Sequence, residues 1–166
     1  DQKTQLSDIT HRLLDLAWEN YRTNILGMQK RGSTGRGISP AYCDETGQWQ
    51  IFYQAFNEKR EFFQDSLKGR VNRAMNTIKH VCQISEEEWH EFFEELSNAE
   101  KKANSDAIEK ELFDNDEFDF SLFKGKDAFS LNFDYLEEIY WSAGQKLAPF
   151  ICDIREGILK NLNCSK

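Results

Sequence analysis

The feature that most constrains the fold is a helical period of apolar residues, which recurs in several long segments of the chain. In the first of these, residues 8 to 29, one side of a helix collects Leu6, Ile9, Leu13, Leu16, Ala17, Tyr21 and Met28. Similar stripes occur between residues 49 and 82, between 85 and 103, and between 133 and 162. No segment gives a convincing strand. The pattern therefore predicts an all-α protein, an antiparallel helical bundle of four to five main helices.

Local signals give the expected ends of these helices. Ser85 and Glu88 have the spacing of a capping box, which marks a helix start. Residues 32 to 48 hold four glycines and a proline, which predicts a long glycine-containing loop after the first helix. A bend is expected near Gly69, where the apolar stripe changes face. Another is expected just before Pro149, whose ring nitrogen has no hydrogen to donate.

Size, charge and cysteines set the class of protein. A chain of 166 residues is long enough for one core, so residues 1–166 are expected to form a single helical domain. The net charge of −8 disfavours a broad nucleic-acid surface, and no apolar run approaches the roughly 20 residues of a membrane span. The first residue is Asp1, not Met, and the cysteine count is even, which gives a lean towards a secreted or periplasmic protein. Disulfides and reduced thiols both stay open for Cys43, Cys82, Cys152 and Cys164.

An acidic, aromatic segment and a basic strip are the candidate contact surfaces. The acidic segment has acidic residues interspersed with aromatic ones and contains Asp114, Asp116, Phe118, Asp119 and Phe120. Its first residues resemble a calcium loop, but the glycine and the final glutamate that such a loop needs are missing. The rings either insert into the protein's own core or bind a groove on another protein. The basic strip contains Arg70 and Arg73, and its charge asymmetry is typical of a docking face.

A metal site is one alternative. Asp8 with His11, and Glu87 with His90, have the carboxylate-x-x-histidine spacing that helical bundles use for metal ligands. Both pairs lie off the apolar stripes, however, and such ligands project into the core. The pattern therefore predicts that these four side chains lie on solvated helix faces.

Two further interpretations depend on short motifs. Arg73 and His80 enclose six residues, and this spacing resembles the Arg-x4-6-His motif of the HEPN ribonucleases, which are helical bundles that act as dimers. The resemblance covers one helix, and Ala74 stands where a polar residue commonly follows the arginine. The second motif, the glycines from Gly32 to Gly37, could present backbone N–H groups to an anion, although a flexible connection explains it as well.

Together these features favour a non-catalytic protein-binding module of the effector, inhibitor, immunity-protein or adaptor type. The expected partner is another protein, and the acidic charge of the chain favours one with a basic surface; no cofactor is expected. A metal-dependent enzyme and a HEPN-like ribonuclease dimer are the alternatives. A carrier of a small apolar ligand is also consistent with so many aromatic residues.

Overall fold

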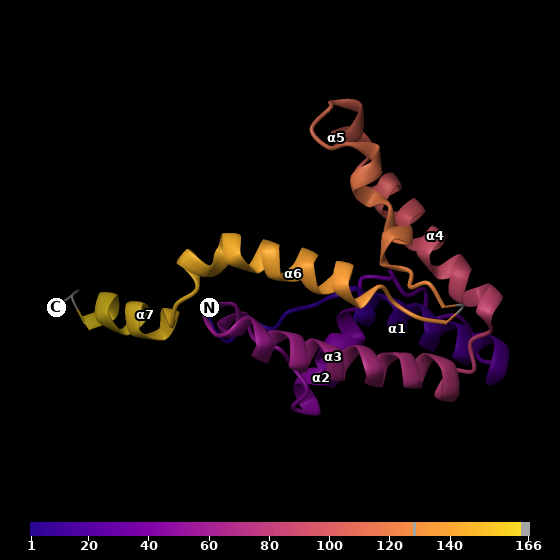
Figure 1. The fold of residues 1–166 in the computed structure, drawn as a ribbon, viewed down its shortest axis with the longest axis horizontal. Helices are drawn as coiled ribbons and strands as arrows, with labels where there is room; N and C mark the ends of the chain where they lie inside the picture. Colours follow the sequence, from indigo (N-terminus) through magenta and orange to yellow (C-terminus); the bar gives the residue numbers. More distant parts are fainter. Residues whose placement is uncertain (128, 164–166) are drawn as a thin grey trace.

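A computed structural model of the chain describes residues 1–127 and 129–163, and within them the side chains of all but residues 115, 116, 156, 162 and 163. The described residues form an all-α helical bundle, as the apolar periodicity predicts (Figure 1). Its α-helices are α1 (Ile9–Asn20), α2 (Ile38–Thr46), α3 (Arg60–Asn76), α4 (Glu86–Ala103), α5 (Ser105–Glu109), α6 (Phe133–Leu147) and α7 (Ile154–Asn163). None of the described helices is long and apolar enough to cross a membrane.

Shorter helical turns extend or connect these helices. Two are single π-turns that continue a long helix, η1 (Tyr21–Ile25) after α1 and η3 (Thr77–Val81) after α3. The others are 3₁₀ turns, η2 (Tyr53–Asn57), η4 (Asn115–Phe118), η5 (Phe120–Phe123) and η6 (Ala148–Phe150). Across proteins such π-turns are rare and frequently lie at functional sites.

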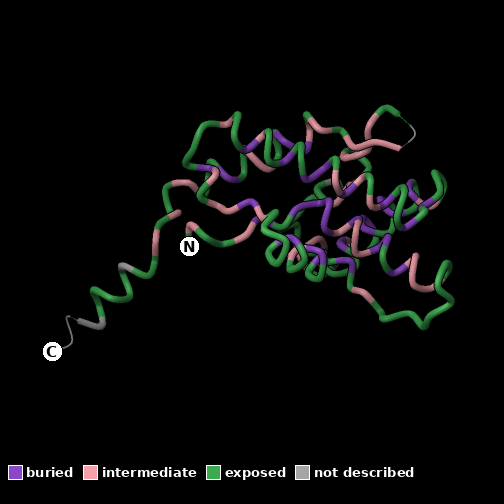
Figure 2. Tube along the Cα trace, turned by 90° about the horizontal axis from the view of Figure 1, so that it is seen from below, coloured by how far each residue is buried: buried purple, intermediate pink, exposed green. Residues whose placement is uncertain are grey.

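The core lies among α1, α3, α4 and the start of α6. Its largest buried side chains are aromatic, and Trp89 packs edge-to-face against Phe93 within α4. Phe63 of α3 stacks obliquely on Phe56 of η2 and on Trp141 of α6, which joins these three elements. Figure 2 shows that buried residues concentrate in this region and are absent from the described part of the C-terminal helix.

Two helix ends follow the sequence prediction. Ser85 caps α4 through a capping box with Glu88: the Glu88 backbone N–H donates to the Ser85 hydroxyl, and the Glu88 carboxylate accepts from the Ser85 N–H at 2.8 Å. The predicted break near Pro149 is also confirmed, because α6 ends at Leu147 and the proline lies in η6.

Two other predictions about the elements are wrong. The glycine-containing loop after the first helix is present over residues 26–37, but its predicted extension to residue 48 is wrong, because that part forms α2. The first turn of α2 includes Pro40, a position where the missing N–H costs nothing. Helix α3 runs straight through Gly69, and the change of apolar face occurs earlier, between η2 and the start of α3. Gly37 makes the entry into α2 possible because its φ of 73° is a left-handed conformation that glycine adopts without strain.

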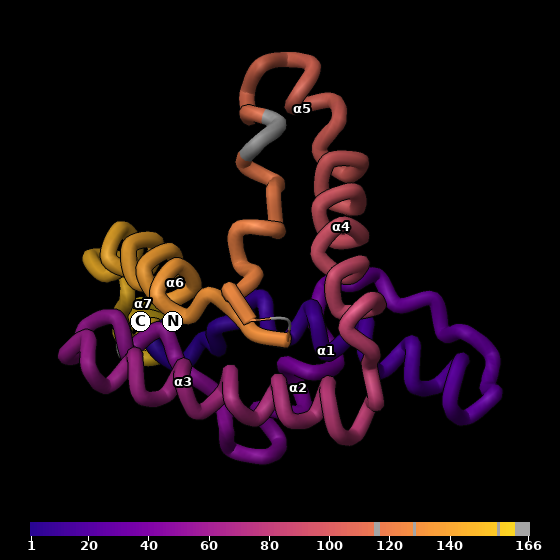
Figure 3. The backbone as a smooth tube through the Cα atoms, turned by 45° about the vertical axis from the view of Figure 1, so that its right-hand side comes forward, coloured from indigo at the N-terminus to yellow at the C-terminus, as the bar shows by residue number. Residues whose placement is uncertain are grey.

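Helix α4 carries the next part of the chain away from the body. Figures 1 and 3 show α5 and the segment that follows it at the far end of α4, after which the chain returns towards α6. We call residues 105–119 the acidic arm. Among the cysteines in the described part of the chain, Cys43 and Cys152 are exposed free thiols and Cys82 is a buried one, while Cys164 lies outside it.

Candidate functional site

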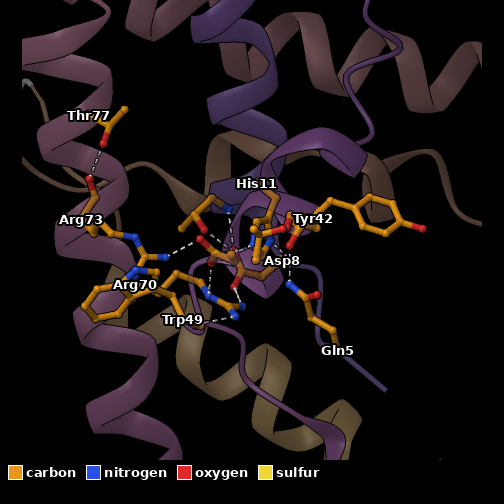
Figure 4. A network of polar contacts seen from close by, with 12 residues as sticks. Gln5, Asp8, His11, Tyr42, Trp49, Arg70, Arg73 and Thr77 are labelled. Atoms are coloured by element: carbon orange, nitrogen blue, oxygen red, sulfur yellow. Dashed lines mark hydrogen bonds and ion pairs between the residues drawn. The ribbon is translucent and has the colours of Figure 1, made fainter. Parts of the chain in front are cut away.

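A buried polar network lies where α1, α2 and α3 meet (Figure 4). It starts at Asp8, the N-cap of α1, whose carboxylate accepts from the Thr10 backbone N–H at 2.8 Å. His11 completes a capping box, because its Nδ1 accepts from the Asp8 N–H at 3.1 Å. Its other ring nitrogen, Nε2, lies 3.2 Å from the Asp44 carboxylate of α2. The histidine thereby connects the start of α1 to α2.

Arg70 of α3 joins both carboxylates of this network. Its guanidinium donates to Asp8 Oδ2 at 2.8 Å and to the Leu6 carbonyl at 3.1 Å, and its Nε lies 3.2 Å from Asp44 Oδ2. The side chain is only 2% exposed. A buried charge is costly unless it is paired and hydrogen-bonded, so Arg70 and the two aspartates depend on one another.

The electrostatics of the network keep both aspartates ionised. Burial alone would raise the pKa of Asp8, but Arg70, His11 and the hydrogen bond from Thr10 outweigh it, and the pKa lies below its ordinary value. Asp44 behaves in the same way: burial opposes ionisation, and the hydrogen bond from His11 with the charges of Arg73 and Arg70 lowers the pKa. The pairing therefore overcomes desolvation at both carboxylates.

An open groove lies next to this network, between α3 with η3 and the segment that precedes η2. It has a volume of about 800 Å³, and its lining includes Trp49, Ile51, Gly69, Arg73, Thr77 and His80. Arg73 donates to Asp44 Oδ1 at 2.6 Å, and its guanidinium lies 4.9 Å from the centre of the Trp49 ring. Asp44 thus holds Arg73 in place. Arg73 in turn covers part of the indole of Trp49, a residue that is 61% exposed.

The prediction for the first carboxylate–histidine pair is wrong. Asp8 and His11 were expected on a solvated face and are fully buried, because the start of α1 is covered by α2 and α3. Glu87 and His90 do lie on an exposed face, that of α4. Among the described residues, no three histidine, cysteine, aspartate or glutamate side chains form a group able to hold a metal ion.

The prediction for the basic strip is also partly wrong. Arg70 is buried in the network, where a solvent-facing residue was expected, while Arg73 is partly exposed at the groove. Arg73 and His80 do line the same groove, as their spacing suggests. Lys68 and Lys79 are exposed on α3 and η3.

The acidic, aromatic segment divides into a half-buried part that packs against the core and an exposed part. Phe120 packs against the core under the Arg12 guanidinium, 4.8 Å from its ring centre, which confirms insertion into the protein's own core. Phe118 contacts Phe113, and Asp119 caps η5. Asp114 is exposed on the arm, and the side chain of Asp116 lies outside the described residues.

The glycine-rich turn after η1 is held by the protein's own carboxylates. The Gly32 N–H donates to Glu19 at 2.9 Å, and the Gly37 N–H donates to Asp15 at 3.2 Å. Arg36 pairs with Glu100 at 2.9 Å. These backbone donors therefore stabilise the connection between α1 and α2, which favours a structural role over anion binding.

Comparison with known proteins yields one partial match. No family model and no solved structure matches the chain. Adenylosuccinate synthetase from Christiangramia forsetii is 32% identical to it over 111 residues. That alignment covers 53% of this chain and 25% of the synthetase, so the chain spans about a quarter of that protein.

Proposed function

We propose that this chain is a non-catalytic binding module whose partner anchors in the groove beside Trp49. The observation that carries the proposal is an exposed tryptophan held by an arginine at the edge of a groove. Tryptophan and arginine are the residues in which interface binding energy most often concentrates. Because Asp44 already positions Arg73, the site loses little side-chain entropy when a partner binds.

The chemistry of the groove favours a partner segment that is both acidic and apolar. Arg73 and His80 offer donors to a carboxylate, while the exposed side chains of Trp49 and Val81 offer apolar surface. Most of the positive charge of α3 is met within the fold, because Arg60 pairs with Glu137 and Glu138, and Arg70 with Asp8 and Asp44. The partly exposed guanidinium of Arg73 is therefore the cation that the groove presents to a carboxylate of the partner.

Peptide selection on the intact chain tests the proposal. Peptides from a random library are selected on the wild-type protein and then measured on Trp49→Ala and on Trp18→Ala, a partly exposed tryptophan at the other end of α1 as control. We expect acidic, aromatic peptides whose affinity falls roughly thirtyfold with Trp49→Ala, the effect of losing a binding hot spot. Equal affinity for the Trp49→Ala protein contradicts the proposal.

A second candidate function comes from the partial match to adenylosuccinate synthetase. In that case the groove takes a ligand like the compound in that enzyme's name, with a purine ring on Trp49 and its anionic groups on Arg73 and His80. Isothermal titration of the chain with adenylosuccinate decides between the two candidates. Binding that Trp49→Ala and His80→Gln both weaken favours the ligand site, and no detectable heat rejects it.

A further inference from the structure

Helix α7 is a short amphipathic helix whose apolar side chains are exposed. Ile154, Ile158 and Leu159 are 46%, 52% and 59% exposed. Within the described part of the chain α7 packs extensively against no other element, and Figures 1 and 2 show it continuing beyond the end of α6, away from the body. A ten-residue helix without tertiary contacts is marginal in water, and Gly157 in its interior lowers its helix propensity further. The apolar face of α7 therefore depends on a contact from outside the chain.

Helix α6 carries a second exposed apolar surface. Ile139, Ala143 and Leu147 follow one another at intervals of one turn, so they share one side of the helix, and all three are exposed. We call these three residues the α6 stripe. The stripe spans about 12 Å of helix, and α7 is about 15 Å long. The α6 stripe thus has the length and the period of a docking site for a helix such as α7.

The N-terminal residues hold the linker between η6 and α7 in its outward direction. The Cys152 carbonyl accepts from the Gln2 backbone N–H at 2.9 Å, and the Ile154 N–H donates to the Asp1 carboxylate at 3.3 Å. The Gln2 amide also donates to the Asp153 carboxylate at 3.4 Å. A return of α7 onto its own α6 would break these hydrogen bonds. They favour the outward direction of α7 and leave the α6 stripe open to a helix from another molecule.

We propose that α7 packs on the α6 stripe of a second copy of this chain, in a two-fold dimer that exchanges the two helices. A two-fold axis beside η6 places α7 of one copy antiparallel to α6 of the other, and repeats the same contact twice. Ile154 then faces Leu147, and Ile158 faces Ala143. In each of these pairs the two residues are equally far along the chain from the end of η6, so one axis satisfies both pairs.

The exposed apolar area is close to what a dimer needs. Six large apolar residues from α6 to α7 are exposed: Ile139, Leu147, Phe150, Ile154, Ile158 and Leu159. Phe150 exposes roughly 150 Å² and each of the others about 80 Å², so two copies together offer on the order of 1,000 Å². Neighbouring polar side chains add to this area, which brings it near the roughly 1,200 Å² at which specific interfaces begin. The interface needs neither the groove beside Trp49 nor charge pairing, and the proposal is independent of the binding function above.

Sedimentation of the intact chain between about 1 and 100 µM tests the dimer, because a small interface is typical of weak association. We expect a monomer–dimer equilibrium that salt does not weaken, since the contacts are apolar. Ile158→Glu should weaken dimerisation at least tenfold, because it places a carboxylate in both apolar contacts. Ala143→Lys should do the same from the side of α6. Glutamate and lysine both favour helices, so the two variants test the contact and not helix formation.

A mixture of these two variants tests the exchange of helices. In the mixed pair, one contact joins an unaltered α7 to an unaltered α6 stripe, and the other contact brings the two substituted positions together with opposite charges. The mixture should therefore dimerise at least fivefold more tightly than either variant alone. A mixture without this gain overturns the proposal, as does a dimer that Ala143→Lys leaves intact, because α7 then packs elsewhere.

Matched controls separate the contact from other effects. Ile38→Glu makes the same change at a residue of α2 that is 60% exposed, and should leave dimerisation within twofold of wild type. Trp49→Ala should also leave it within twofold, so a failure of the groove proposal and a failure of the dimer are distinguishable. Thermal unfolding at about 1 µM should be alike in wild type, Ile158→Glu and Ala143→Lys. A wild-type protein that stays monomeric at about 100 µM overturns the proposal.

Discussion

At the scale of single residues, the polar network behaves as one unit because its charges are buried together. Arg70→Met retains the apolar stem of the side chain but removes the guanidinium, and leaves Asp8 as a buried carboxylate without its cation. We expect a loss of about 3–5 kcal/mol in the free energy of unfolding, the cost of breaking a buried ion pair. Urea unfolding followed by circular dichroism measures it.

Two further variants separate charge pairing from packing. Lys68→Met alters an exposed residue on the same helix and should change stability by less than about 0.5 kcal/mol. Adding Asp8→Asn to Arg70→Met removes the orphaned charge and should recover part of the loss. We compare how much Asp8→Asn lowers the stability of Arg70→Met with how much it lowers the stability of wild type. Equal losses in the two backgrounds contradict coupling between Asp8 and Arg70.

The same aspartates make stability depend on pH. The pKa values of Asp8 and Asp44 are lowered in the folded protein from an ordinary value of 3.8, so at acidic pH the unfolded chain binds more protons than the folded one. Their contribution is complete above about pH 5 and is lost as the pH falls through 3.8 towards the folded values. Unfolding free energies between pH 7 and pH 3 should fall more steeply in wild type than in Asp44→Asn.

At the scale of elements, two helical glycines should respond in opposite directions to the same substitution. A Cβ at Gly144 of α6 would overlap the Phe56 ring, so Gly144→Ala forces α6 away from η2 and should cost about 1–3 kcal/mol. Gly69 of α3 has no atom within 4 Å of such a Cβ, and Gly69→Ala should stabilise the helix by about 0.5–1 kcal/mol. Thermal unfolding of the two variants compares them, and a stabilising Gly144→Ala contradicts the packing.

Elements with their own local signal could be predicted from the sequence, and those set by tertiary contacts could not. The capping box at Ser85 and the stop before Pro149 act within a few residues, so both predictions are confirmed. Helix α2 was missed because glycines dominate its surroundings and its position depends on the contact of Asp44 with His11 and Arg70. The predicted bend at Gly69 was wrong because the neighbouring turns of α3 keep the helix continuous through this glycine, from Arg60 to Asn76.

At the scale of the whole molecule, the candidate site shows why only part of it could be predicted. Arg73 and His80 lie on one continuous helical stretch, so their spacing alone places them on one groove. Asp44 and Trp49, which complete the site, come from a segment interpreted as loop and helix, and no short-range pattern connects them with α3. The burial of Asp8 and His11 has the same origin, because their partner Arg70 is 62 residues from Asp8 in the chain.

The reaction rate of one thiol, that of Cys82, reports the stability of the whole molecule. Cys82 is fully buried at the end of η3, and burial raises its pKa to about 11, so in the folded protein it is both covered and protonated. In a variant with the other three cysteines replaced by serine, Cys82 should react with a thiol reagent at least 10³-fold more slowly than in urea, given a typical stability of 5 kcal/mol or more. Adding Arg70→Met should raise the folded-state rate at least tenfold, because the network and Cys82 then open in one transition. A rate unaffected by Arg70→Met would show that the end of α3 opens locally, independently of the core.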